Sequence, residues 1–153
     1  MIQKNKTALQ KATDLLARQE QSEKVLRQKL LVRKYDGAEV DAAIDKLKKY
    51  KYLDDAETCA TLFENLYAEE KLSVKQICLK LLQRGYDSNF VEKLIPADTY
   101  EHEYNAALKV ATKKFAGKFS SDVKFKQKIW QHLAAKGFDS EIISAVIEKL
   151  NNN

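Results

Sequence analysis

Residue types that commonly carry out catalysis are few in this sequence and do not gather into a recognisable site. The two histidines, His102 and His132, have no serine or aspartate nearby at the spacing of a catalytic triad. Cys59 and Cys78 do not form a CxxC pair, so no zinc site is predicted. The phosphate-binding patterns GxxxxGK(S/T) and GxGxxG do not occur. We therefore expect no enzymatic activity, no metal and no cofactor, and we expect the protein to act by binding.

Basic side chains at recurring positions are the stronger candidates for function. They form three pairs whose members are four residues apart, and this spacing places each pair on one face of a helix. The pairs are Lys29/Arg33, Lys80/Arg84 and His132/Lys136, and Arg18, Lys24 and Arg27 extend the same set. We call these residues the basic row, and such a row suits phosphates or an acidic protein groove. The alternative is that exposed helix positions simply favour Lys and Arg.

The overall charge is modest and unevenly distributed. Residues 1–52 hold 13 Lys and Arg against 7 Asp and Glu, residues 53–97 hold 5 against 8, and residues 98–153 hold 9 against 7. The net charge of +5 therefore comes mainly from the first third of the chain. This asymmetry favours a polyanion or an acidic protein surface as a partner near the N-terminal end.

The basic row recurs because the sequence itself repeats. Ser22–Asp36 matches Ser73–Asp87 at 8 of 15 positions, and a weaker third copy follows 52 residues later. A period near 50 residues indicates tandem units, each too small to bury its apolar face alone. The spacing of apolar residues before each copy makes the repeat three helices long.

Within each copy the pattern predicts a helix, a tight turn and a second helix. Gly85 and Gly137 suit the left-handed conformation that ends a helix, and Lys34 occupies that place in the first copy. An aromatic residue and an aspartate follow, and the aspartate is expected to cap the next helix. In the first copy Glu39, three residues after Asp36, predicts a capping box. The aromatic residues, expected to form hydrophobic staples, are Tyr35, Tyr86 and Phe138.

Composition agrees with an all-α fold. The chain of 153 residues has one proline and four glycines, and 44% of its residues are apolar. We predict three tandem three-helix repeats, about nine helices in all, at residues 1–52, 53–97 and 98–153, in an elongated, curved, right-handed solenoid-like stack. No apolar run is long enough for a membrane span, and the first seven residues contain no apolar signal core. We therefore expect a cytoplasmic protein with two buried thiols.

Four stretches give the chain a resemblance to a known family. They are Leu16–Ser22 (LARQEQS), Leu26–Leu30 (LRQKL), Tyr52–Asp55 (YLDD) and Leu82–Tyr86 (LQRGY). Over nearly its whole length the sequence resembles the RecX family of regulators of the RecA recombinase. The resemblance implies three-helix repeats, binding to RecA filaments, and suppression of ATPase and strand-exchange activities, and some members of the family also bind DNA.

The sequence departs from the family pattern at a few positions. Lys34 and Lys51 stand where the family often has glycine, and Thr58–Ala60 stands where it often has Arg-Phe-Ala. The first two changes affect turns, and the third removes an Arg-Phe pair that could contact a partner.

Three functional hypotheses follow. The first is a monomeric modulator of the RecA filament that uses the basic row and lies along the filament groove. The second is a protein that binds single- or double-stranded DNA through units that resemble a helix-turn-helix motif, such as Ser22–Leu47. The third is a helical scaffold for another protein, in which case the basic row has no role.

Overall fold

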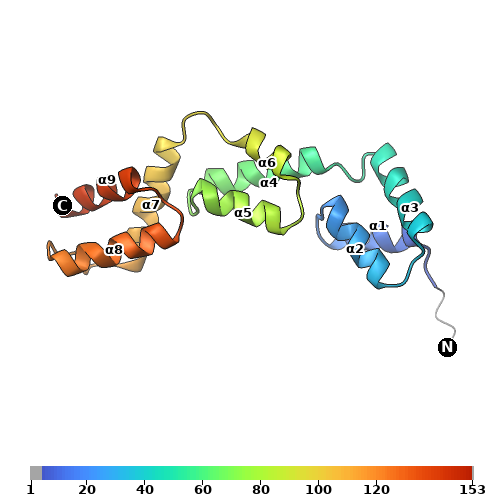
Figure 1. Ribbon diagram of the computed structural model, residues 1–153, viewed down its shortest axis with the longest axis horizontal. Coiled ribbons are helices and arrows are strands. Elements are labelled where there is room, and N and C mark those ends of the chain that lie inside the picture. Colours follow the sequence, from blue (N-terminus) through green and yellow to red (C-terminus); the bar gives the residue numbers. More distant parts are fainter. Residues whose placement is uncertain (1–4, 153) are drawn as a thin grey trace. The chain divides into compact units, whose positions relative to one another are not determined.

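The computed structural model describes residues 5–152, and in these residues it contains nine α-helices and no strands (Figure 1). The helices are α1 Ala8–Arg18, α2 Glu23–Val32, α3 Gly37–Lys49, α4 Asp55–Glu69, α5 Val74–Gln83, α6 Ser88–Leu94, α7 Tyr100–Lys114, α8 Val123–Ala135 and α9 Ser140–Asn151. The predicted all-α fold and the number of helices are confirmed. No described helix combines the length and apolar character needed to cross a membrane. The expectation about the start of the chain falls mostly on residues 1–4, which lie outside the described residues.

The chain divides into two compact units. Unit 1 comprises Met1–Thr61 and Leu81–Val91, and unit 2 comprises Leu62–Lys80 and Glu92–Asn153. In unit 1, helices α1, α2 and α3 pack against one another, and in unit 2 the same is true of α7, α8 and α9. The repeat boundaries at residues 52 and 97 and the curved stack of repeats stay predictions.

Each unit has its own apolar core. Leu26, Leu30 and Ile44 are fully buried in unit 1, and Ile129 and Leu133 are buried in unit 2. These residues recur at intervals of three or four along their helices, so each helix turns one apolar face inward. Burial of one such side chain contributes roughly 1.5–3 kcal/mol, and packing of these faces holds short helices together.

The helices α2, α5 and α8 end in the same turn. In α5 the amide of Gly85 donates to the carbonyl of Leu82 at 2.9 Å, and the amide of Tyr86 donates to that of Leu81 at 3.2 Å. This pair of bonds is a Schellman motif, which requires a left-handed residue at its centre. The central residues are Lys34, Gly85 and Gly137, with φ of 67°, 88° and 89° respectively. The predicted turn is therefore confirmed in all three copies.

A serine explains why two of these turns need glycine. The hydroxyl of Ser22 caps α2 and also donates to the carbonyl of Arg84 at 2.8 Å. A β-carbon on Gly85 would lie only 2.6 Å from that hydroxyl oxygen. In unit 2, Ser73 donates to the carbonyl of Lys136 at 2.7 Å, and the turn glycine again leaves no room for a side chain. We call these contacts the serine junctions.

A carboxylate completes each serine junction. Asp55 accepts a hydrogen bond from the first amide of α2, that of Glu23, at 3.0 Å. Glu103 accepts one from the first amide of α5, that of Val74, at 2.6 Å. A negative group at a helix N-terminus satisfies an unpaired amide and complements the helix dipole. Burial raises the pKa of both carboxyl groups above their usual range.

The expected capping box at the start of α3 is wrong. Asp36 occupies the N-cap but makes no hydrogen bond through its side chain. Glu39 instead accepts a hydrogen bond from the amide of Ala8 at 2.9 Å, so it caps α1 rather than its own helix. Both roles satisfy a free amide at a helix start, and the spacing within one helix cannot distinguish them.

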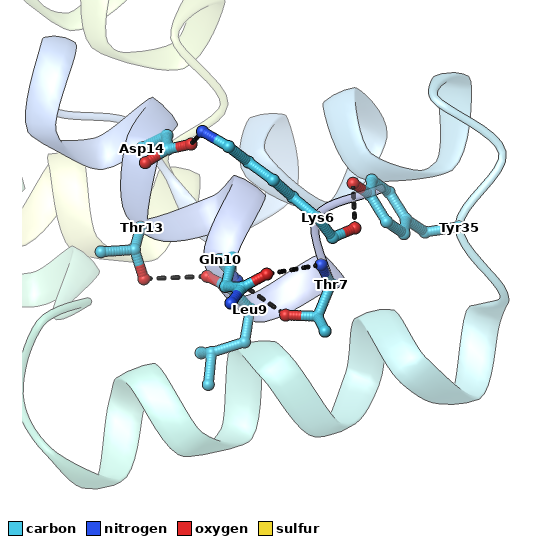
Figure 2. A network of polar contacts seen from close by, with 7 residues as sticks. All are labelled: Lys6, Thr7, Leu9, Gln10, Thr13, Asp14 and Tyr35. Carbon is cyan, nitrogen blue, oxygen red and sulfur yellow. Dashed lines mark hydrogen bonds and ion pairs between the residues drawn. The ribbon is translucent and has the colours of Figure 1, made fainter. Parts of the chain in front are cut away.

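The N-terminus of α1 is held by a small polar network (Figure 2). Thr7 and Gln10 form a reciprocal capping box, and Lys6 makes an ion pair with Asp14. The hydroxyl of Tyr35 donates to the carbonyl of Lys6 at 2.8 Å, so the aromatic residue after the first turn also fixes the approach to α1. The equivalent hydroxyl of Tyr86 is buried and has no partner within the described residues. Burial raises the pKa of Tyr86 to about 12.

We predict that substitutions at two equivalent turns have opposite effects on the free energy of unfolding. Gly85→Ala should lower the free energy of unfolding by about 2 kcal/mol or more, because it adds a β-carbon against Ser22 and a left-handed alanine. Lys34→Gly should raise it by about 0.5–1 kcal/mol, because the exposed lysine already has positive φ. Urea unfolding measures both. Gly37→Ala, in open space at the start of α3, is the control, and equal effects at Gly37 and Gly85 would contradict the junction.

The two tyrosines give a second matched pair. Tyr86→Phe should raise the free energy of unfolding by about 1 kcal/mol, because it removes a buried hydroxyl without a partner. Tyr35→Phe should lower it by about 1 kcal/mol, because it breaks the hydrogen bond to Lys6. Thermal and urea unfolding would show the difference. A loss of stability in Tyr86→Phe would mean that the hydroxyl has a favourable contact.

Candidate functional site

A basic cleft of about 570 Å³ lies within unit 2. Its walls come from the residues around the start of α5, from the second half of α7 and from the end of α8. The lining residues are Lys71, Leu72, Gln76, Lys109, Val110, Lys113, Lys114, His132 and Lys136. We call it the lysine cleft. It contains five lysines and no acidic residue, so its lining suits a ligand with several negative charges.

Helical spacing places these cations together. Lys109 and Lys113 are four residues apart on α7, and Lys114 lies in the last turn of the same helix. His132 and Lys136 are also four residues apart, at the end of α8. The serine junction in unit 2 fixes this end, because the carbonyl of Lys136 accepts the hydroxyl of Ser73. The side chain of Lys136 remains exposed.

Most of the positive charge is not neutralised by neighbouring carboxylates. Lys109 lies 3.4 Å from Glu70, and Lys71 lies 3.9 Å from Glu69. The hydrogen bond from Asn105, followed by that from Lys109, lowers the pKa of Glu70, so this carboxylate is ionised. The other three lysines of the cleft, Lys113, Lys114 and Lys136, make no ion pair within the described part of the chain.

The pKa of His132 responds to the positive charge inside the cleft. Its ring is half-buried, and it meets the ring of Phe115 edge-on with centroids 5.8 Å apart. Burial lowers the pKa of His132, and the positive charges of Lys114 and Lys136 lower it further. Both effects favour the neutral form of the imidazole. A bound anion would favour its protonated form, so anion binding and proton uptake are coupled.

Comparisons with known proteins identify the family. Residues 8–47 match the model for "RecX, first three-helix domain", and residues 101–147 match that for "RecX, third three-helix domain". "Regulatory protein RecX" of Clostridioides difficile is 30% identical over 146 residues, which cover 95% of this chain and 68% of that protein. The protein of the same name from Clostridium botulinum strain Eklund 17B is 30% identical, with 92% and 67% covered. The chain belongs to the RecX family.

The family relationship has a defined extent. A third relative, the RecX protein of Clostridium beijerinckii, is 30% identical over 84% of this chain and 61% of its own length. The chain thus spans about three fifths to two thirds of the length of these relatives. The crystal structure of RecX from Lactobacillus salivarius has a TM-score of 0.80 at 24% identity, and the match covers 95% of this chain and 96% of that one. This similarity supports the three-helix fold.

The members of the basic row have different surroundings within their own units. Lys136 joins His132 in the lysine cleft, whereas Lys80 is exposed in the last turn of α5 and does not line it. Arg18 is exposed at the end of α1, and Arg84 is exposed directly after α5. Because these residues belong to two units, a continuous basic row stays a prediction.

Two members of the row in unit 1 have partners of their own. Arg27 makes ion pairs with Asp41 and, at 3.8 Å, with Glu23, so much of its charge is neutralised. The guanidinium of Arg33 donates to the carbonyl of Lys29 at 2.9 Å. Arg33 is exposed and Lys29 is half-buried. Lys24 is exposed and lines a hollow of mixed charge beside Gly85.

Sequence comparison between repeats could not find the other cleft lysines. Lys71, Lys109, Lys113 and Lys114 come from one loop and one helix, and they are not repeated in register with the basic row. The spacing of Lys109 and Lys113, followed by Lys114, was the available indication of a charged helix face. Only the packing of α8 against α7 brings that face to His132.

We predict that the cleft lysines depress the pKa of His132. NMR titration of its ring should give a pKa below the usual value of about 6.5. Lys114→Gln and Lys136→Gln should each raise this pKa, because each removes a nearby positive charge. Lys149→Gln on α9 is a matched control outside the cleft and should leave the pKa unchanged.

The lowered pKa of His132 also determines how the stability of the fold depends on pH. Because the folded state lowers the pKa of His132, neutral His132 contributes stability above the unfolded pKa of about 6.5. That contribution is lost as the pH falls through the folded pKa, and Lys114→Gln should weaken the dependence. An unchanged His132 titration in both glutamine variants would contradict a positive potential in the cleft.

Proposed function

We propose that this chain regulates the RecA recombinase by binding its filament, and that binding inhibits the ATPase and strand-exchange activities. Membership of a family of regulatory proteins supports a role in regulation. The observation that carries the proposal further is the lysine cleft, in which Lys113, Lys114 and Lys136 make no ion pair within the described residues and so suit an anionic partner. A filament of RecA on DNA offers such anions, either as phosphates or as an acidic protein groove.

The cleft favours binding over chemistry. Three of its lysines lie on α7 and Lys136 directly follows α8, so the helices position most of the positive charge that an entering anion would meet. Among the described residues, no three His, Cys, Asp or Glu side chains gather as metal ligands would. We infer that regulation depends on occupancy of the filament by this chain.

A second candidate function is direct binding of DNA through the same cleft. Phosphate contacts by lysine release counterions, so the affinity for free DNA should then fall steeply as salt rises. An affinity that does not depend on salt, or no binding at low salt, would exclude this candidate. The scaffold hypothesis predicts instead that reversing the cleft charges has no effect on RecA or on DNA.

The test is RecA ATPase on single-stranded DNA with increasing amounts of this protein. The wild type should inhibit, and a cleft variant with Lys113→Glu, Lys114→Glu and Lys136→Glu should need at least about tenfold more protein for half-inhibition. The reason is that three attractive charges become repulsive. A second variant reverses the basic row at Lys29, Arg33, Lys80 and Arg84, and it tests whether that row contributes.

A control variant with the same net charge as the cleft variant distinguishes binding at the cleft from an effect of the overall charge of the protein. Lys118, Lys124 and Lys128 are exposed in unit 2 and do not line the cleft, so their reversal to Glu should change half-inhibition by less than about twofold. Equal losses in the control and the cleft variant would reject the cleft as the binding site. If the wild type leaves the ATPase unchanged at stoichiometric excess, the proposed function is wrong.

A further inference from the structure

A second hollow lies within unit 1, between α1 and the end of α3, and its chemistry differs from that of the lysine cleft. Its volume is about 470 Å³. The lining residues are Leu9, Thr13, Leu16, Ala17, Lys46, Leu47, Tyr50 and Tyr52. We call it the tyrosine groove. None of its residues lines the lysine cleft, so the two surfaces can be tested separately.

The groove has an apolar floor. Leu47 is buried, and Leu9 and Leu16 are half-buried against the core of unit 1. The hydroxyl of Thr13 donates to the carbonyl of Leu9 at 2.8 Å, so the donor of this polar side chain is already satisfied (Figure 2). An occupant therefore gains affinity here by burying apolar side chains.

Two tyrosines that line the groove are exposed. Tyr50 is 59% exposed and Tyr52 is 74% exposed, values that are high for aromatic residues on a folded surface. Exposed aromatic residues beside an apolar hollow are typical of binding sites, because they bury a large area at a small cost in side-chain entropy.

The backbone holds both tyrosines in place. The amide of Tyr52 donates to the carbonyl of Leu47 at 2.9 Å, and the amide of Lys51 donates to that of Lys48 at 3.1 Å. These bonds form a Schellman motif, with Lys51 in the left-handed conformation at φ of 60°. The backbone that carries the tyrosines is thus preorganised, and a partner does not have to order this turn.

The charges near the groove favour a partner of negative charge. Lys46 is the one charged residue of its lining, and Lys49 and Lys51 follow it closely in the chain. These three lysines are exposed and make no ion pair within the described residues. The neighbouring Asp14 is neutralised by Lys6. The groove therefore has an apolar floor and one lining cation, Lys46, with the other two lysines within five residues of it in the chain and one exposed carboxylate, Asp45, directly before it.

We propose that the tyrosine groove docks an acidic segment of a partner protein, in which apolar side chains enter the groove and flanking carboxylates meet the lysines. Nucleic acid fits less well, because the lining has one cation and apolar walls. A second copy of the same groove also fits poorly, since the lysines near it carry the same positive charge. The inference goes beyond the proposed function, because it assigns a separate surface to a protein ligand.

The probe is a synthetic amphipathic peptide with Leu at positions 1, 4, 5 and 8 of its helix and Glu at the exposed positions. Its binding to the full chain is measured by fluorescence anisotropy, and the site is mapped by NMR amide shifts. The acidic peptide should bind at least about tenfold more tightly than a peptide with Lys in place of Glu, or one with Ser in place of Leu. The perturbed amides should lie in α1 and at the end of α3.

Variants of the protein identify the groove. The double substitution Tyr50→Ser and Tyr52→Ser should weaken binding at least about tenfold, because it removes both exposed anchors. Lys46→Glu should weaken it by about three- to tenfold, and this loss should diminish at high salt. Tyr100→Ser, at an exposed tyrosine in unit 2, is the control and should bind like the wild type.

Several outcomes would overturn the inference. Equal binding of the lysine peptide would reject the charge argument, and amide shifts confined to unit 2 would place the peptide in the lysine cleft. Full affinity in the double tyrosine variant would reject the groove. A dimer in sedimentation that dissociates on the double tyrosine substitution would make a second copy the occupant. The cleft variant with Lys113, Lys114 and Lys136 reversed should still bind the peptide, so this test does not depend on the effect on RecA.

Discussion

The fold depends on a serine hydroxyl that serves two helices at once. Ser22 caps α2 and donates to the carbonyl of Arg84, and Ser73 does the same for α5 and Lys136. Each contact joins residues more than sixty positions apart. Because a hydroxyl can donate and accept, each serine satisfies an amide at the start of one helix and a carbonyl at the end of another. The turns at residues 85 and 137 need glycine because a β-carbon there would lie too close to the serine hydroxyl.

The serine junction in unit 2 also builds the lysine cleft. Ser73 donates a hydrogen bond to the backbone carbonyl of Lys136, and Lys136 lines the cleft together with the other four lysines. Next to it, the ring of His102 is buried, contacts the carbonyl of Leu72 at 2.9 Å through Nε2 and stacks on Tyr67. Leu72 is itself part of the cleft wall. Hydrogen bonds from a serine hydroxyl and an imidazole ring to backbone carbonyls therefore fix this part of the cleft wall.

Local patterns in the sequence predicted the helices and turns well, and they predicted long-range contacts poorly. Gly85 and Gly137 were correctly predicted as left-handed turn residues, because each glycine follows an apolar helical pattern at the equivalent place in its copy. Their second role, close approach to a serine, depends on packing between repeats and has no local pattern. Glu39 shows the same limit, because a carboxylate three residues after a cap can serve either its own helix or a neighbour. Lys71, Lys109, Lys113 and Lys114 were missed because no equivalent lysines recur in the other copies of the repeat.

The two surfaces of this RecX-family chain should respond differently to solution conditions. Attraction in the lysine cleft is mainly electrostatic, so added salt weakens it strongly. Binding in the tyrosine groove depends largely on apolar area, which salt affects much less. A partner that engages both would be held by two contacts on one chain, and the second contact would form at a high effective concentration once the first has formed. Such a partner would keep measurable affinity at salt concentrations that abolish binding through the cleft alone.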